Sequence, residues 1–319
     1  MKRFTHITPT SIHEVIPLLS EYSRPLAGGT DVLTELKEGL VEPDQLVSLR
    51  KLSELRGVTF DAGVHIGALT TLTELSRHPQ IKDGPYQALA QSARLAASPQ
   101  LRNMATIGGN LLQDVRCWYY RGPFDCWLKG GDGCPARDGE HHKHALFEQS
   151  PCVAVQPSDP ATALLALDAT VSVAGPSGTR SVGMQELLVP PTASRRKLHT
   201  LQLDELITTI QLPARDGWQS IYLKAMERAT YSFALVGVAV AIKLDAGIFA
   251  DARIVLGGVA NTPLLMEDAA QQLVGQPLNE ATIAAVAQLA TQNAQPLPHT
   301  HYKAAMVQRL VCHALATMV

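Results

Sequence analysis

Four of the chain's five cysteines lie between residues 117 and 152, so this segment has a chemical role that ordinary packing does not require. The cysteines are separated by 8, 7 and 17 residues, with glycines and a proline between them. This sequence predicts an irregular loop rather than a helix, and a loop can fold around a metal or a cluster. The four candidate ligands are Cys117, Cys126, Cys134 and Cys152.

The spacing of the cysteines favours some metal sites over others. No Cys-x-x-Cys pair occurs, which argues against a zinc ribbon because structural zinc sites commonly use close pairs. Disulfides would need an oxidising compartment, for which the sequence gives no evidence. An iron–sulfur cluster held by four thiolates tolerates wider spacings. Spacing alone therefore favours iron–sulfur, with zinc and disulfides or free thiols as alternatives.

Other ligand candidates lie within or beyond this segment. The run His141-His142-Lys143-His144 resembles a metal-binding tract, but its polar surroundings predict a solvated turn. Cys312 belongs to an apolar helical pattern, where a buried structural thiol is expected. Neither feature is therefore expected to add a ligand.

The composition of the whole chain is typical of a globular protein. Its 319 residues are 46% hydrophobic and 18% charged, which predicts a sizeable core and two or three domains. The net charge is −2 without long runs of either sign, so neither nucleic acid nor an anionic membrane is an expected partner. No stretch approaches the roughly 18 apolar residues of a membrane span, and no apolar signal region follows the start. We therefore expect a cytoplasmic protein without a membrane span.

Two glycine loops predict an anion site. Residues 24–39 indicate a strand, a Gly28-Gly29 turn and a helix ending at Gly39, in which backbone N–H groups and Thr30 could converge on an anion. Residues 101–112 repeat the pattern, with a threonine and a glycine pair before an apolar run. Two such loops fit an elongated diphosphate ligand, whereas unrelated turns that merely need positive φ are the alternative.

The remaining patterns outline two domains. Residues 57–67 predict a hairpin, residues 71–77 and 86–97 predict helices, and a strand over 205–213 closes the first domain near residue 214. The last third differs, because three strand-like runs over residues 221–259 precede helices. The predicted helices cover residues 265–274, 279–293 and 300–317. The C-terminal part is therefore expected to be an α+β domain.

Five motifs are spread over nearly the whole chain: Leu26-Ala-Gly-Gly-Thr-Asp, Ala105-Thr-Ile-Gly-Gly-Asn, Pro157-Ser-Asp, Lys224 within residues 222–234, and Val255-Leu-Gly-Gly-Val-Ala. Together they closely resemble the FAD-binding medium subunits of the molybdenum hydroxylases, the xanthine oxidase family. In that family the loop after Gly-Gly-Asn usually lacks these cysteines. Residues 110–117 and the later cysteine spacing resemble the branch with an extra 4Fe-4S cluster, of the periplasmic aldehyde oxidoreductase and 4-hydroxybenzoyl-CoA reductase types.

The resemblance implies an α+β fold with two domains. A two-part FAD-binding domain of the vanillyl-alcohol-oxidase/PCMH type would cover residues 1–214, with subdomains of about 1–55 and 56–214 and a cysteine-rich cluster loop at 114–156. A C-terminal domain of medium-subunit type, with a three-stranded antiparallel sheet and helices, would cover residues 215–319.

The resemblance also implies roles for individual residues. Asp159 would accept hydrogen bonds from the hydroxyl groups of the flavin chain, Ile207 would lie against the isoalloxazine, and Lys224 would stabilise the negative charge of the reduced ring. The four cysteines would ligate the cluster. The implied FAD contacts are Leu26, Ala27, Gly28, Gly29, Thr30, Asp31, Val32, Thr106, Ile107, Gly108, Gly109, Asn110, Asp159, Ile207 and Lys224.

A division of labour among subunits follows from the resemblance. A large partner would carry the molybdenum cofactor and the substrate site, and a small partner would carry two 2Fe-2S clusters. This chain would relay electrons through FAD to an external acceptor during oxidation of an aldehyde or an aromatic heterocycle, and would hold no catalytic residue of its own. A 4-hydroxybenzoyl-CoA reductase type of enzyme is the alternative within the family, and export together with a partner would place the complex in the periplasm.

Two other classes of function compete with this interpretation. A self-contained flavin oxidase would need its own substrate-binding base, and covalent-flavin relatives often place a histidine beside the glycine pair, where this chain has Thr30. We therefore expect non-covalent, dissociable FAD. A zinc-stapled interaction module without redox chemistry is the second competitor.

Overall fold

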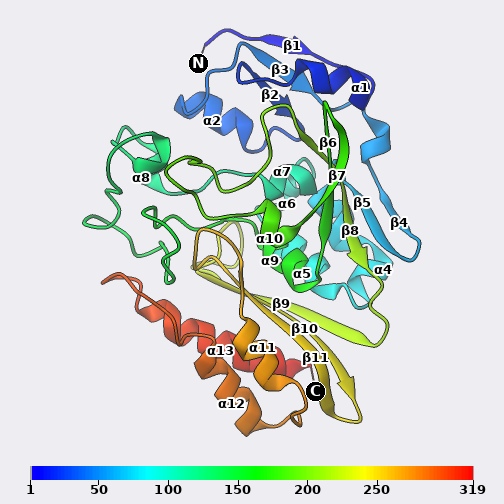
Figure 1. The fold of residues 1–319 in the computed structure, drawn as a ribbon, viewed down its shortest axis with the longest axis vertical. Helices are drawn as coiled ribbons and strands as arrows, with labels where there is room; N and C mark the ends of the chain where they lie inside the picture. Colours follow the sequence, from blue (N-terminus) through cyan, green and yellow to red (C-terminus); the bar gives the residue numbers. More distant parts are fainter. Residues whose placement is uncertain (1, 319) are drawn as a thin grey trace.

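The computed structural model describes residues 2–318, which form three β-sheets with helices between them (Figure 1). The first sheet is parallel and lies at the N-terminal end of the molecule, with the strand order β1-β3-β2. Parallel neighbours need crossover connections, which the helices α1 and α2 supply. The elements are β1 (Thr5–Ile7), α1 (Ile12–Val15), β2 (Ser23–Leu26), α2 (Val32–Glu38) and β3 (Gln45–Ser48).

Helix α1 is shorter than its sequence pattern, a capping motif at Ser11–Glu14 followed by an amphipathic run to Leu19, predicts. The hydroxyl of Ser11 caps it by accepting a hydrogen bond of 3.3 Å from the N–H of Glu14, as this motif predicts. The α-helix stops at Val15 and continues as a 3₁₀ turn over Ile16–Leu18. Pro17 has no N–H to donate to the α-helical ladder, which explains the change of geometry.

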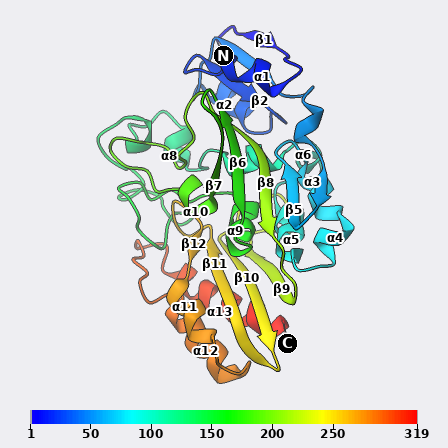
Figure 2. The same ribbon diagram turned by 45° about the vertical axis from the view of Figure 1, so that its right-hand side comes forward.

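The second sheet has five antiparallel strands in the order β4-β5-β8-β6-β7 and occupies the middle of the molecule (Figure 2). Its central strand β8 pairs with the predicted hairpin of β4 and β5 on one side and with β6 on the other. The strands are β4 (Val58–Phe60), β5 (Gly63–Gly67), β6 (Thr170–Gly175), β7 (Gly178–Gly183) and β8 (Leu206–Pro213). The helices are α3 (Leu72–Arg77), α4 (Pro79–Lys82), α5 (Gln87–Leu95), α6 (Pro99–Arg102), α7 (Ile107–Leu111), α9 (Asp159–Ala166) and α10 (Met184–Leu187).

The third sheet is antiparallel, with the order β12-β11-β10-β9. It contains the three expected strands and a fourth strand, β12, of two residues. One face packs against the C-terminal helices, whereas Tyr222, Ala239 and Val255 on the other face join the core around α5 and α9. Burial of both faces explains the continuous apolar run of β10. The elements are β9 (Trp218–Ala225), β10 (Val236–Asp245), β11 (Ile248–Gly257), β12 (Leu264–Leu265), α11 (Glu267–Leu273), α12 (Glu280–Leu289) and α13 (Tyr302–Thr317).

The cysteine-rich stretch between residues 114 and 156 is irregular, as its glycine and proline content predicts. It contains only α8 (Trp118–Arg121) and a 3₁₀ turn over Trp127–Lys129. Figures 1 and 2 place it along one side of the molecule, between the first sheet and the C-terminal helices. No helix within residues 2–318 is both long and apolar enough to cross a membrane.

Candidate functional site

A cavity of about 220 Å³ lies where the first and second sheets meet. Its walls come from the loop between β2 and α2, from the segment around α7, and from Leu206 and Ile207 at the start of β8. The two glycine loops, which lie almost eighty residues apart in the sequence, therefore border one cavity. Sequence-predicted FAD contacts in its lining are Ala27, Gly28, Gly29, Thr30, Asp31, Val32, Thr106, Gly108, Gly109, Asn110 and Ile207.

The first glycine loop leaves a run of backbone donors available to a ligand. No hydrogen bond within residues 2–318 uses the N–H groups of residues 28–32, and all five residues line the cavity. Gly29 has a φ of +73°, a conformation that side chains other than glycine rarely adopt. Successive unpaired N–H groups form a concavity that binds anions such as phosphate. This loop is therefore suited to hold a diphosphate.

Close packing fixes the first loop against the second. A Cβ atom on Gly28 would lie 1.8 Å from the carbonyl oxygen of Met104, two residues before Thr106. Only a residue without a side chain fits between these two segments. The cavity is thus preformed by backbone contact between the loops.

The second glycine loop contributes walls rather than donors. The N–H of Ile107 donates to the carbonyl of Thr70 and the N–H of Gly108 donates to the carbonyl of Ala68, both at 2.9 Å. The N–H of Gly109 lies 3.3 Å from the hydroxyl of Thr106. These N–H groups are already paired, so the second loop lines the cavity without offering these donors to an anion. The side chain of Ile107, a predicted FAD contact, is fully buried in the core.

Charged groups cluster at one end of the cavity, around Asp31. The carboxylate of Asp31 lies 2.7 Å from the guanidinium of Arg116 and 3.2 Å from that of Arg121, and it accepts a hydrogen bond of 2.9 Å from the N–H of Asp114. Burial opposes ionisation of Asp31, but the two arginines keep its pKa below the usual value. Burial together with the negative charges of Asp31 and Asp114 raises the pKa of Glu35 to about 8. At neutral pH Asp31 is therefore ionised and Glu35 holds a proton.

Sequence reasoning did not identify several polar residues of the cavity. Arg24, Glu35, Gln113 and Arg116 line it without belonging to either glycine motif. Arg116 directly precedes Cys117, and this position between the second glycine loop and the cysteines was the available signal. Arg116 also lies over the ring of Phe233, with 5.3 Å between the guanidinium carbon and the ring centroid.

Asp159 and Lys224 are buried together, away from the cavity lining. Their side chains are 4% and 1% exposed, and the Lys224 ammonium lies 2.7 Å from one Asp159 oxygen. The hydroxyl of Tyr222 donates to the other oxygen at 2.6 Å, and Lys224 also donates to the carbonyl of Leu95 at 3.0 Å. The structure thus brings these two predicted flavin contacts to each other. Leu26, at the end of β2, likewise lies outside the lining.

The four clustered cysteines converge although the segment that carries them is irregular. Cys126 and Cys152 are buried, all four are free thiols, and Cys117 contacts both hydrophobic clusters that the segment forms. Burial raises the pKa of Cys117 to about 11 and that of Cys152 to about 12. Cys126 and Cys134 add to the shift of Cys117, and the other three thiols add to that of Cys152. A metal or cluster would have to displace the protons of these thiols.

The histidine run beside the cysteines is not the solvated turn that its polarity predicts. His141 and His144 are each only 3% exposed, whereas His142 is exposed. His141 donates from Nδ1 to the carbonyl of Ala136 at 2.9 Å and accepts from the N–H of His299 at 3.2 Å. His144 Nε2 lies 3.2 Å from Cys117 Sγ. Surfaces from the C-terminal domain cover the run, and sequence polarity could not reveal them.

The donor atoms are not spaced for a single metal ion. Between residues 2 and 318, no three side chains of histidine, cysteine, aspartate or glutamate lie close enough to share one. Four thiolates on one zinc would approach each other to about 4 Å, because Zn–S bonds are about 2.3 Å long.

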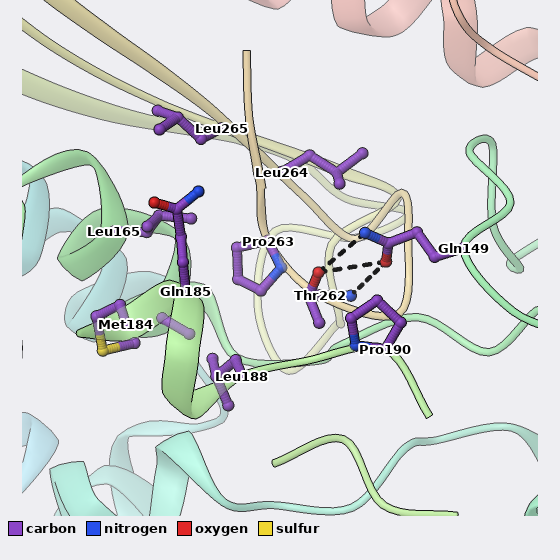
Figure 3. A pocket seen from close by; sticks show the side chains of 11 residues that line it. Gln149, Leu165, Met184, Gln185, Leu188, Pro190, Thr262, Pro263, Leu264 and Leu265 are labelled. Atoms are coloured by element: carbon purple, nitrogen blue, oxygen red, sulfur yellow. Dashed lines mark hydrogen bonds between the residues drawn. The ribbon is translucent and has the colours of Figure 1, made fainter. Parts of the chain in front are cut away.

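A second cavity, of about 190 Å³, lies between α10 and the β11–β12 connection (Figure 3). Its walls are mostly apolar, and its polar groups Gln149 and Thr262 hydrogen-bond to each other at 3.1 Å. No charged residue lines it. It is therefore unsuited to a diphosphate.

Comparisons with known proteins agree with this geometry. Residues 2–215 match the model of the FAD-binding domain in molybdopterin dehydrogenase, and residues 221–318 match the CO dehydrogenase flavoprotein C-terminal domain. The chain belongs to the FAD-binding medium subunits of the molybdenum hydroxylases. The cavity residues fit FAD, since the open donors of residues 28–32 face a diphosphate-sized site with two arginines in its lining.

Relatives of this FAD-binding subunit include bacterial enzymes of several substrate classes. It is 38% identical over 254 residues, covering 78% of each chain, to the aldehyde oxidoreductase FAD-binding subunit PaoB of Escherichia coli. It is 28% identical to the nicotinate dehydrogenase FAD-subunit of Eubacterium barkeri, covering 97% of this chain and 93% of that one. The carbon monoxide dehydrogenase structure from Hydrogenophaga pseudoflava matches with a TM-score of 0.78 at 26% identity, covering 98% of this chain and 96% of that one.

Proposed function

We propose that this subunit relays electrons through non-covalent FAD and a 4Fe-4S cluster held by Cys117, Cys126, Cys134 and Cys152. Its partners are a large molybdopterin-binding subunit and a small 2Fe-2S subunit, and electrons leave to an external acceptor. The overall reaction is oxidation of an aldehyde or an aromatic heterocycle, in keeping with the names of the aldehyde oxidoreductase and nicotinate dehydrogenase relatives.

The observation that carries the FAD assignment is the run of unpaired N–H groups over residues 28–32. Together with Arg24 and Arg116, these donors would hold the diphosphate, and Ile207 would lie against the rest of the cofactor. When bound, FAD supplies a carrier that accepts two electrons and releases them singly or as a pair. The chain's own residues bind and orient it and exclude water around it.

Two observations support a cluster at the cysteines. Neighbouring thiols contribute to the raised pKa of Cys117 and of Cys152, and hydrophobic side chains such as Trp127 and Leu128 surround the cysteines.

The chain also links the two proposed cofactor sites by a short path. Cys117 follows directly after Arg116, which lines the FAD cavity and pairs with Asp31. A change of charge at Cys117 would therefore act on Arg116, the neighbouring residue, whose side chain lines the FAD cavity. Lys224 is paired with Asp159 outside the cavity lining, so its expected charge beside the reduced flavin is not part of this proposal.

A visible spectrum with metal analysis of the purified full-length protein tests this function. We expect flavin absorption above a broad brown absorption and four irons per chain. Cys126→Ser should lose iron while keeping FAD, whereas Cys312→Ser, which changes a half-buried thiol in α13, should keep both. A colourless protein with one zinc would overturn the cluster, and steady turnover of a substrate by the isolated chain would overturn the relay role.

A further inference from the structure

The imidazole of His144 lies between the cysteine site and the C-terminal domain, and it is held in one orientation. Its Nε2 atom is 3.2 Å from Cys117 Sγ, and the backbone N–H of His144 donates to the carbonyl of His141 at 2.8 Å. The ring meets the ring of Trp118 edge to face, with 5.0 Å between the centroids. The side chain is 3% exposed, so water does not compete for its polar atoms.

We infer that His144 is a positioning residue that donates a hydrogen bond from Nε2 to the sulfur of Cys117 and thereby raises the reduction potential of the cluster. This inference rests on the proposed 4Fe-4S site. It assigns to the C-terminal domain a role in electron transfer, because that domain covers His144 and holds its segment in place.

The direction of the hydrogen bond follows from the partners of the ring. A sulfur that ligates iron is a thiolate and can only accept, so Nε2 must carry the proton. The other ring nitrogen, Nδ1, is buried without a hydrogen-bond partner among residues 2–318, which agrees with a neutral ring protonated at Nε2.

Contacts from α13 fix the segment that presents His144. The ammonium of Lys303 donates to the carbonyl of Lys143 at 3.1 Å and to the carbonyl of Gly258 at 2.9 Å. The hydroxyl of Tyr302 donates to the carbonyl of His142 at 2.7 Å. Two successive carbonyls before His144 are therefore anchored to the last helix, which leaves the imidazole little freedom to move away from Cys117.

The effect on the potential follows from charge. One-electron reduction adds a negative charge to the cluster and its thiolates, so a donor aimed at one sulfur stabilises the reduced form more than the oxidised form. Removing the donor should favour the oxidised form. Side chains around the ligands of a metal site commonly tune it in this way.

The test is an EPR-monitored redox titration of the cluster in the purified complex, with dithionite as reductant. His144→Leu removes the donor and keeps an apolar side chain, and His144→Gln restores an N–H donor near the position of Nε2. His142→Leu is the matched control, since it changes an exposed imidazole of the same run. At the wild-type midpoint, the ratio of reduced to oxidised cluster should fall by roughly threefold to tenfold in His144→Leu, the equivalent of one neutral hydrogen bond. His144→Gln should recover most of the wild-type ratio, and His142→Leu should not change it.

Iron analysis separates this inference from the proposed function. If the wild-type protein lacks four irons, the cluster itself is refuted. If the wild type holds four irons and His144→Leu titrates at the wild-type potential, the hydrogen bond has no effect and the inference is wrong. Loss of iron from both His144 variants would show that the imidazole is a ligand or a folding requirement, which also overturns the inference.

Discussion

The guanidinium of Arg116 lies 2.7 Å from the carboxylate of Asp31, although 85 residues separate the two in the sequence. Asp31 belongs to the loop that borders the FAD cavity, and Arg116 is the residue before the first cysteine of the cysteine segment. Both side chains are partly buried, at 24% exposure for Arg116 and 19% for Asp31. The ion pair therefore joins the flavin site to the cysteine site within a single contact.

Replacing Arg116 should weaken FAD binding. Arg116→Ala removes a cation from the cavity and leaves the negative charge of Asp31 less compensated, so that charge repels the diphosphate. We expect the FAD dissociation constant to rise by about tenfold, the equivalent of one charge-assisted hydrogen bond. Fluorescence titration of the deflavinated protein measures it, and Arg77→Ala, on an exposed part of α3, should leave it unchanged. Equal affinities for the wild type and Arg116→Ala would remove Arg116 from the site.

Gly28 should tolerate no side chain. In Gly28→Ala the new Cβ would meet the carbonyl oxygen of Met104 at 1.8 Å, so the two loops must separate. We expect loss of FAD and a destabilisation of about 1–3 kcal/mol, as for other overpacked sites. Gly133→Ala is the control, because open space surrounds Gly133. Flavin content and urea unfolding of both variants measure the effects, and a Gly28→Ala protein with full flavin would contradict the close contact between the loops.

Lys224 should stabilise the fold in addition to any role beside the flavin. Lys224→Met leaves the carboxylate of Asp159 buried with only the hydroxyl of Tyr222 as a partner. Removing one member of a buried ion pair costs about 3–5 kcal/mol. Urea unfolding of the deflavinated protein measures this cost without a contribution from FAD. Lys82→Met is the control, because the Lys82 side chain is 62% exposed, and it should unfold like the wild type. A Lys224→Met protein that unfolds like the wild type would show that the ion pair does not stabilise the fold.

The buried carboxyl of Glu35 should make stability depend on pH. Its pKa is about 8 in the folded protein, above the ordinary glutamate value of 4.5, so between these values the folded state binds more protons than the unfolded state. The free energy of unfolding of the wild type, measured relative to that of Glu35→Gln, should therefore fall as the pH rises from 4.5 to about 8. The fall should be at most about 1.4 kcal/mol per pH unit. Urea unfolding of the deflavinated proteins at pH 5 and pH 8 tests this. Parallel pH dependence of the two proteins would show that Glu35 is ionised throughout.

Local chemistry made much of the fold predictable. The Gly28-Gly29 turn, the stop of α2 at Gly39 and the hairpin over residues 57–67 each follow from glycines, which adopt positive-φ backbone conformations that other residues rarely reach. The predicted capping of α3 by Thr71 is present because its hydroxyl and Glu74 satisfy each other's backbone donors. These features depend on neighbours within a few positions, which a sequence displays directly.

Features that depend on distant partners could not be predicted. Nothing in the sequence around Asp31 indicates that Arg116 and Arg121 will occupy its carboxylate, or that β9 will bring Tyr222 and Lys224 to Asp159. The same limit applies to the availability of backbone donors. Both glycine loops have the same pattern, but only the first keeps its N–H groups unpaired. In the second, the carbonyls of Ala68 and Thr70 and the oxygens of Thr106 accept from residues 107–110.

The cysteine segment contacts parts of the chain that are synthesised at very different times. Asp31, which binds its first residues, leaves the ribosome long before the segment does, whereas Tyr302 and Lys303, which anchor residues 142 and 143, follow those residues by 160 positions. The segment can therefore complete its contacts only after α13 has been synthesised. If the thiols hold the proposed cluster, an iron–sulfur donor must reach them before α13 docks on residues 142 and 143.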